Sequence, residues 1–317
     1  MINYERLLPL INASKNVAII SHVIPDGDTL GCGLAFQSVL LKMGKTVDFF
    51  CDGEVEDNLL KVLGNFKMNE QTVQSYDLAI AIDSSSFDRL GIYYNLFRKS
   101  KKRVVIDHHI SHQKFGDIDF LEIRSATGEM IFDLVEKHYS KYIDEFFAKC
   151  IYVSILTDSG AFAFDSVSKE TFEIISKLYN YNVNFANIYY ELMRNQKLST
   201  FKVQSYAKNK ALFFARNQIA FITFSLADFQ KNNGVESDTF GAINDVINIE
   251  EVKIALSLTE VNARNFRVSV RTKGEISASE IAQSFGGGGH KNASGFRING
   301  YLENVIDDIL KVCKDNL

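Results

Sequence analysis

Short apolar runs alternate with segments of helical periodicity in the first half of the chain. Four of these runs have the length and the β-branched content of buried strands, and they cover residues 17–21, 46–50, 78–83 and 103–107. Apolar residues recur at helical spacing in the segments between and after them, namely 29–43, 56–63, 128–139, 144–157 and 168–180. Strands that alternate with helices build a parallel sheet covered on both faces. Residues 1–183 are therefore predicted to form an α/β domain around a parallel sheet.

The second half of the chain has a different order of elements. Residues 184–210 are polar, compatible with helix and without a clear strand, which predicts a helical connector. Two apolar runs then flank Ala215-Arg216-Asn217, as in a β-hairpin. The pattern next predicts two strands and two helices, at residues 252–259, 266–271, 278–284 and 302–314. Residues 211–317 are therefore predicted to form a smaller mixed α/β domain.

Length and composition agree with two folded domains. A chain of 317 residues exceeds one ordinary core, and its 46% hydrophobic and 23% charged residues are typical of globular proteins. No apolar run approaches the roughly 18 residues of a membrane span. At the start, Glu5 and Arg6 stand where a signal peptide needs apolar residues. We therefore expect a cytoplasmic protein that has no membrane partner.

Cysteine usage and net charge exclude further classes. The four cysteines contain no CxxC pair, which argues against a disulfide framework and a structural zinc site. The formal net charge is -4, whereas proteins that hold long nucleic acid through its phosphates carry a positive excess. A long duplex is therefore not an expected partner. Any nucleic acid that binds should be short, or held by a local basic pocket.

Acidic residues and histidines gather where the predicted strands end. Each has an ordinary explanation when taken alone, such as a turn, a helix cap or a helix stop. The carboxyl ends of parallel strands, however, meet at one edge of a sheet, where α/β proteins bind their ligands. Chance does not readily explain so many acids at one such edge. The residues are Asp26 and Asp28 after the first strand, Asp83 after the third, Asp107, His108 and His109 at the fourth, and Asp158 at the end of a helix.

Six of these polar groups define a candidate metal centre, namely His22, Asp26, Asp28, Asp83, His108 and Asp158. Four converging carboxylates without cations would have to take up protons, whereas two divalent cations neutralise them. Mixed carboxylate and imidazole ligands suit Mn²⁺, with Fe²⁺ and Co²⁺ as alternatives; Mg²⁺ prefers oxygen ligands and water. A pair of such ions can activate water for displacement at phosphorus. The sequence therefore predicts a dinuclear centre that cleaves phosphoesters.

The same residues resemble the motifs of the DHH phosphoesterase superfamily. The matching segments run in the family's order and are SHVIPDGD (21–28), Asp83, DHH (107–109), ILTDSGAF (155–162) and SFGGGGHKNASGF (284–296). The last segment is similar to the signature of the DHH-associated C-terminal domain. The architecture resembles the short, stand-alone NrnA-type enzymes, or nanoRNases. Two positions depart from the pattern, since Cys32 and Ser294 stand where serine and alanine are frequent.

The resemblance implies a role for each polar residue of the motifs. One metal ion would be held by His22, Asp26 and Asp83, and the other by Asp28, Asp83, His108 and Asp158, so that Asp83 bridges the ions. Asp107 would orient a ligand histidine, as residues behind metal ligands commonly do. His109 would face the substrate phosphate, either as a hydrogen-bond donor or as a proton donor to the leaving oxygen. The resemblance also implies an active site in the cleft between the domains.

The C-terminal motif carries the candidate substrate-binding residues. Arg271 matches the family's substrate-binding arginine, and a guanidinium grips phosphate through two hydrogen bonds. Glycines let backbone N–H groups approach a phosphate closely, which assigns Gly287, Gly288 and Gly289 to the same task together with His290. A flexible linker is the other interpretation of these glycines. Arg194, in the connector, is a further candidate.

These features predict a manganese-dependent hydrolase of short 5'-phosphorylated oligoribonucleotides. It would release mononucleotides and would also act as a 3'-phosphatase on 3'-phosphoadenosine 5'-phosphate (pAp). The alternative within the same family is a phosphodiesterase for cyclic di-AMP or its linear product pApA. A nucleotide-binding protein without catalysis is the alternative from another class, and the six filled ligand positions argue against it. Related proteins often dimerise, so a homodimer is one of the oligomeric states that the sequence allows.

Overall fold

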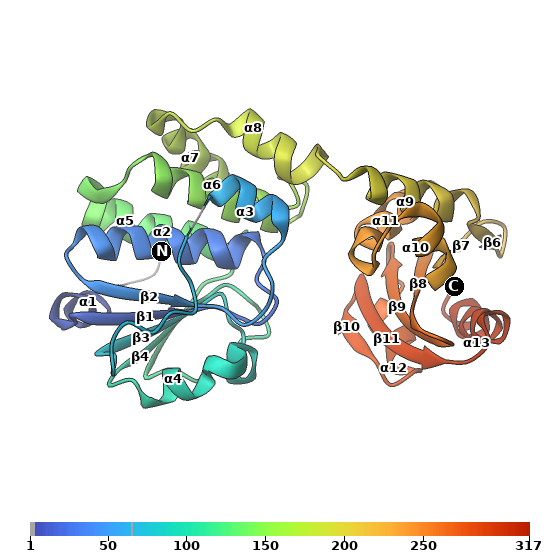
Figure 1. Ribbon diagram of the computed structural model, residues 1–317, viewed down its shortest axis with the longest axis horizontal. Helices are drawn as coiled ribbons and strands as arrows, with labels where there is room; N and C mark the ends of the chain where they lie inside the picture. Colours follow the sequence, from blue (N-terminus) through green and yellow to red (C-terminus); the bar gives the residue numbers. More distant parts are fainter. Residues whose placement is uncertain (1–3, 65) are drawn as a thin grey trace. The chain divides into compact units, whose positions relative to one another are not determined.

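The computed structural model describes residues 4–64 and 66–317, apart from the side chain of His290. The chain divides into two compact units, Met1–Asn195 and Gln196–Leu317, which are drawn in Figure 1. None of the helices in the described ranges combines the length and the apolar character needed to cross a membrane.

A five-stranded parallel sheet forms the centre of the first unit. Its strands are β1 (Asn16–Ile20), β2 (Thr46–Phe50), β3 (Leu78–Ile82), β4 (Arg103–Asp107) and β5 (Ile118–Leu121), in the order β2-β1-β3-β4-β5. Each neighbouring pair is parallel. The predicted parallel α/β domain is thereby confirmed. The sequence pattern missed β5, a short edge strand that lacks a continuous buried run.

Helices cover both faces of this sheet. In Figure 1, α2, α5 and α6 lie on one side of it and α4 on the other. Val17 and Ile19 of β1 join the larger core, and Ala18 and Ile20 join the smaller core on the opposite face. Burial on both faces explains why the strands are continuously apolar instead of alternating. The helices are α1 (Leu8–Ala13), α2 (Gly27–Lys42), α3 (Asp57–Leu63), α4 (Tyr94–Lys99), α5 (Thr127–Tyr139), α6 (Glu145–Asp158), α7 (Lys169–Leu178) and α8 (Phe185–Tyr189).

The second unit contains a six-stranded mixed sheet in the order β10-β11-β9-β8-β7-β6. Only the β7–β8 pair is parallel among the strand pairs of this sheet in the described residues. The predicted hairpin joins β6 to β7 through Ala215, Arg216 and Asn217, all with positive φ. The elements are α9 (Leu198–Asn209), β6 (Leu212–Phe214), β7 (Ile219–Phe224), α10 (Leu226–Asn232), α11 (Ala242–Ile247), β8 (Ile254–Asn262), β9 (Asn265–Thr272), α12 (Ala278–Gln283), β10 (Gly288–His290), β11 (Ala293–Asn299) and α13 (Leu302–Asp315).

Candidate metal centre

The sheet order places three chain segments at one point of the carboxyl edge. The chain leaves β1 toward β2 on one side of the sheet, and later toward β3 and β4 on the other side. Ligand sites in open α/β sheets lie at such a reversal, beyond the carboxyl ends of the strands. His22 follows β1, Asp83 follows β3, and His108 follows β4. The topology therefore brings these residues together from distant parts of the sequence.

The six predicted ligands converge in this region. Within each of three groups, ligand atoms lie within 4.8 Å of one another, and the groups are His22, Asp26 and Asp83; Asp28, His108 and Asp158; and Asp83, His108 and His109. Asp83 and His108 each belong to two groups, so the three groups form one continuous cluster. The structure thus brings together all six residues of the predicted metal centre, in groups that could hold a metal ion.

The two candidate ligand histidines have the same orientation. His22 Nδ1 lies 2.7 Å from the Val23 carbonyl oxygen, and His108 Nδ1 lies 3.0 Å from the Arg124 carbonyl oxygen. A carbonyl oxygen only accepts, so each Nδ1 carries the proton and each Nε2 presents a lone pair in the neutral ring. Both Nε2 atoms face the Asp83 carboxylate, at 3.5 and 3.6 Å. A lone pair opposite a carboxylate needs a cation or a proton between them, and metal-binding histidines are held in this way.

Asp83 occupies the centre of the cluster. Its residue is buried, and its φ of 57° lies in the left-handed region, which aspartate tolerates better than most residues. The Oδ2 atom accepts from Thr29 Oγ1 at 2.7 Å, and Oδ1 accepts from Thr127 Oγ1 at 3.0 Å. Oδ2 also faces His22, whereas Oδ1 faces His108. The two oxygens thus face different histidines, which is the arrangement expected of a carboxylate that bridges two ions.

Asp28 is fixed by two helices. It lies in the first turn of α2 and accepts from the backbone N–H groups of Thr127 and Gly128, at 2.8 and 3.1 Å, where α5 begins. The hydroxyl of Ser154 on α6 donates to it at 2.5 Å. A Cβ atom at Gly128 would lie 1.9 Å from Ser154 Oγ, so this contact requires glycine. Helix packing therefore positions the carboxylate.

The electrostatics of the cluster show a shortage of positive charge. Burial, together with the charges of Asp83 and Asp158, raises the pKa of Asp28 well above its usual range. Burial likewise raises the pKa of Asp158 to about 6. Burial would lower the pKa of His22, but Asp26 and Asp83 outweigh it and raise that pKa to about 10. Buried carboxylates that share a site with two imidazoles form a donor set that fits two divalent ions.

His109 is oriented differently from His22 and His108. Its Nδ1 lies 2.7 Å from Asp107 Oδ1, and this hydrogen bond raises the pKa of His109. Because Nδ1–H donates to Asp107, this nitrogen has no lone pair for a metal ion, although it also lies 3.6 Å from Asp83 Oδ1. Its Nε2 has no hydrogen-bond partner among the residues that the structure describes. The side chain of His109 is about one third exposed, which leaves it accessible to substrate.

The contacts of Asp107 bear on the role that the resemblance implies for it, to orient a ligand histidine. Its carboxylate contacts His109 and His112. The candidate ligand His108 is oriented by the Arg124 carbonyl. The Arg124 side chain is itself held by carboxylates, among them Asp133 at 2.9 Å.

Sequence reasoning missed the residues that support the candidate ligands, namely Thr29, Thr127, Ser154, Arg124 and His112. Serine and threonine occur at many unrelated positions, so their presence carries no local signal. His112 had a signal, because it follows the DHH motif by three residues.

The predicted substrate-binding arginines lie in different units. Arg271 is on β9, where its guanidinium donates to the Val270 carbonyl at 3.1 Å. Burial lowers its pKa, and no carboxylate in the described part of the chain forms an ion pair with it. Arg194 ends the helical segment Tyr190–Arg194 of the first unit and contacts the Tyr189 hydroxyl at 3.4 Å. Arg271 thus has unused hydrogen-bonding capacity.

The glycine-rich segment forms an edge strand. Gly288 to His290 build β10, which pairs with β11, whereas the His290 side chain lies outside the described part. A Cβ atom at Gly287 would lie 2.3 Å from the Gly295 carbonyl oxygen, and one at Gly289 would lie 2.6 Å from that of Ala293. Close packing against β11 therefore explains two of the glycines. Around Gly288 the space is open.

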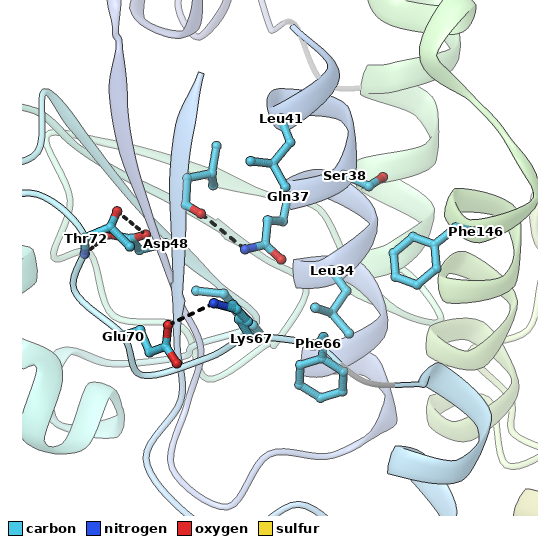
Figure 2. A pocket seen from close by; sticks show the side chains of 12 residues that line it. Leu34, Gln37, Ser38, Leu41, Asp48, Phe66, Lys67, Glu70, Thr72 and Phe146 are labelled. Carbon is cyan, nitrogen blue, oxygen red and sulfur yellow. Dashed lines mark hydrogen bonds and ion pairs between the residues drawn. The ribbon is translucent and has the colours of Figure 1, made fainter. Parts of the chain in front are cut away.

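A separate cavity of about 400 Å³ lies beside α2 and β2 and contains none of the candidate ligands. Figure 2 shows Leu34 of α2 and Phe146 on its wall, and Asp48 bonded to Thr72. Asp48 accepts from the backbone and hydroxyl of Thr72 and from the Tyr76 hydroxyl. The Asp48 carboxylate already has hydrogen-bond donors within the protein, so this cavity does not offer the unsatisfied carboxylates of the candidate metal centre.

Two family descriptions match the chain. The N-terminal domain of the DHH family matches residues 16–155, and the DHHA1 domain matches residues 218–317. Together with the fold and the cluster, these matches show that the chain belongs to the DHH family of phosphoesterases.

Similar proteins cover nearly the whole chain. A probable bifunctional oligoribonuclease and PAP phosphatase NrnA from Streptococcus mutans is 26% identical over 318 residues, which is 100% of both chains. The bifunctional oligoribonuclease and PAP phosphatase NrnA of Mycoplasma pneumoniae is 28% identical over 96% of this chain and 93% of its own. An exopolyphosphatase-related protein from Bacteroides fragilis superposes with a TM-score of 0.89 at 24% identity, covering 98% of this chain and 94% of its own. That structure supports the fold.

Proposed function

We propose that this chain hydrolyses short 5'-phosphorylated oligoribonucleotides to mononucleotides and removes the 3'-phosphate of pAp. The observation that carries the proposal is Asp83, whose two oxygens face His22 and His108 on either side. This arrangement suits a dinuclear phosphoesterase. The names of the relatives from Streptococcus mutans and Mycoplasma pneumoniae support the choice of substrates.

The candidate ligands divide into two sets that share Asp83. His22 and Asp26 would complete the site of one Mn²⁺ ion, and the other ion would be held by Asp28, His108 and Asp158. Two bound ions would supply an activated water and would neutralise charge that develops on the phosphate. Mn²⁺ is the proposed ion because the set mixes imidazole with carboxylate, and Mg²⁺, Co²⁺ and Fe²⁺ are the alternatives.

The remaining residues act on the substrate directly. His109 directs Nε2 to the phosphate, where it donates a hydrogen bond or gives a proton to the leaving oxygen. Asp107 accepts from Nδ1–H, which orients the ring and leaves Nε2 to carry the proton that is donated. Arg271 binds a phosphate of the substrate through the guanidinium N–H groups that are not used by the Val270 carbonyl. Gly288, with open space around its backbone, and His290 are proposed to assist, and Arg194 is a further proposed contact.

A substrate panel with and without metal tests the proposal. Purified protein is incubated with RNAs of 2 to 24 nucleotides, pAp, pApA and cyclic di-AMP, in Mn²⁺ and in EDTA. We expect turnover of pAp and of the shortest RNAs in Mn²⁺, with rates that fall beyond about five nucleotides because the site accepts a short ligand. Unchanged turnover in EDTA would contradict the dinuclear centre. Equal rates on a 5-mer and a 24-mer would contradict the length preference, and a preference for cyclic di-AMP or pApA would favour the alternative phosphodiesterase.

A further inference from the structure

A row of four side chains, linked by hydrogen bonds, leads from the candidate centre into the protein. The buried carboxylate of Asp107 accepts from His109 Nδ1 through Oδ1 and contacts His112 Nδ1 through Oδ2, each at 2.7 Å. His112 Nε2 lies 2.9 Å from Asp119 Oδ2. Asp119 belongs to β5, which is the neighbour of β4 in the sheet. His109 is the member of this row that reaches solvent.

Asp119, at the far end of this row of side chains, is anchored to the backbone. Asp119 accepts from the N–H groups of Phe115 and Gly116, at 3.1 and 2.9 Å. Only 2% of the His112 side chain and 5% of the Asp119 side chain are exposed. The carboxylates of Asp107 and Asp119 are therefore both held inside the protein, away from solvent.

The contacts of His112 hold its ring in place. A carboxylate oxygen lies within hydrogen-bond distance of each ring nitrogen, and a carboxylate only accepts. An aspartate with one partner can rotate about its side-chain bonds, whereas Asp107 is held by a donor at each oxygen. Burying two carboxylates beside an imidazole is costly in desolvation and contributes little to stability. Stability alone is therefore a poor explanation for its presence beside the centre.

We propose that His112 is a positioning residue for the reaction. Anchored by Asp119, it fixes the Asp107 carboxylate, which in turn holds His109 with the proton on Nδ1 and Nε2 directed toward the substrate. The described contacts of His112 are with Asp107, Asp119 and Phe115, and none of these is a candidate metal ligand. The kinetic part of this inference rests on the proposed function, whereas the orientation of His109 does not.

The kinetic test compares His112→Leu with His112→Gln, whose amide can still donate to Asp107. We expect His112→Leu to lower kcat about 10- to 100-fold, as loss of a residue behind a site typically does. KM and bound Mn²⁺ should stay unchanged, and His112→Gln should recover part of kcat. The matched control is His138→Leu at the end of α5, which should leave kcat unchanged.

A double variant separates positioning from a general structural role. In a His109→Ala background, His112→Leu should have no further effect on kcat, because it acts through His109. The inference is overturned if His112→Leu lowers kcat equally in both backgrounds, or if it leaves kcat unchanged in the wild-type background. Asp119→Asn repeats the test if His112→Leu does not fold, with a smaller loss expected.

A spectroscopic test needs neither substrate nor metal. Nitrogen-15 spectra of the six histidines report which ring nitrogen carries the proton. We expect His109 to be protonated on Nδ1 in the wild type and to become a mixture of tautomers in His112→Leu. An unchanged His109 signal would overturn the inference. A changed signal in a protein that cleaves none of the tested substrates would contradict the proposed function and leave the positioning role supported.

Discussion

The two edges of the parallel sheet use the same residue types in opposite ways. At the amino edge, Asp77 precedes β3 and accepts from the N–H groups of Lys15 and Asn16, at 3.0 Å each, and from Lys101 Nζ at 2.8 Å. Asp117 precedes β5 and pairs with Arg103 at the start of β4. Both acids have cationic partners within the chain. Accordingly, the pKa values of both lie below their usual range.

At the carboxyl edge, no lysine or arginine of the described residues pairs with Asp28, Asp83 or Asp158. These acids face one another and the Nε2 atom of His108. Burial raises the pKa of Asp28 and Asp158, whereas the pKa of Asp83 is lowered because His22 outweighs the effect of burial. The comparison teaches that acid content alone does not define a site. An acid satisfied by N–H groups and lysine stabilises structure, whereas buried acids that lack positive charge predict a bound cation.

The largest expected effect is that of Asp83→Asn. The substitution keeps the size of the side chain and its tolerance of positive φ but removes the charge shared by both proposed ion sites. We expect phosphoesterase activity to fall to background and bound Mn²⁺ to fall toward zero, measured by turnover and by metal analysis of the purified protein. Asp77→Asn, at the opposite edge, is the control and should retain both. Two ions still bound to the Asp83 variant would refute the bridging role.

Arg271→Ala should separate substrate binding from metal binding. Loss of a charged hydrogen bond of about 1.5–3 kcal/mol corresponds to a KM increase of roughly 10- to 100-fold. Bound Mn²⁺ should be unchanged, because the carboxyl edge of the first unit is intact. The matched control is Arg267→Ala on the same strand, whose guanidinium already pairs with Glu236. A loss of metal in the Arg271 variant, or an equal rise of KM in the control, would contradict this assignment.

Added Mn²⁺ should stabilise the folded protein through the carboxyl edge. A ligand at 100 times its dissociation constant contributes about 2.7 kcal/mol if it binds only the folded state. We expect the midpoint of thermal unfolding to rise by several degrees in the wild type and in Asp77→Asn, measured by scanning calorimetry. The Asp83→Asn variant should show almost no rise. An equal rise in all three proteins would place the ion elsewhere.

The smallest effect concerns acid pH at the amino edge. The Asn16 N–H group, Lys101 and the Lys15 N–H group lower the pKa of Asp77 to about 2. A pKa lowered by folding contributes stability above the unfolded value near 4, and this contribution is lost as the pH falls toward 2. We expect about 1 kcal/mol, because solvent weakens a partly exposed ion pair. Urea unfolding at pH 5 and at pH 2.5 measures the effect; the difference in unfolding free energy between wild type and Asp77→Asn should shrink at the lower pH, and a constant difference would contradict it.

The sequence by itself determined four strands of the parallel sheet and the candidate ligands. The predicted strands at 46–50 and 103–107 coincide with β2 and β4, because burial on both faces produces an apolar run that is visible locally. The acids that follow such runs meet at one edge once the sheet is parallel. The edge strand β5 and the hairpin of β10 and β11 escaped prediction, because partly exposed or glycine-rich strands lack that run.

Tertiary structure alone decided how the ligands are held. Thr127 reaches Asp83 across 44 residues of sequence, and Ser154 reaches Asp28 across 126. It also decided that Asp107 orients His109, and that His112 stands behind Asp107 with Asp119 as its anchor. The physical reason is range. Hydrophobic periodicity acts over neighbouring residues and is readable in the sequence, whereas a hydrogen bond between distant residues exists only after the sheet and its helices have packed.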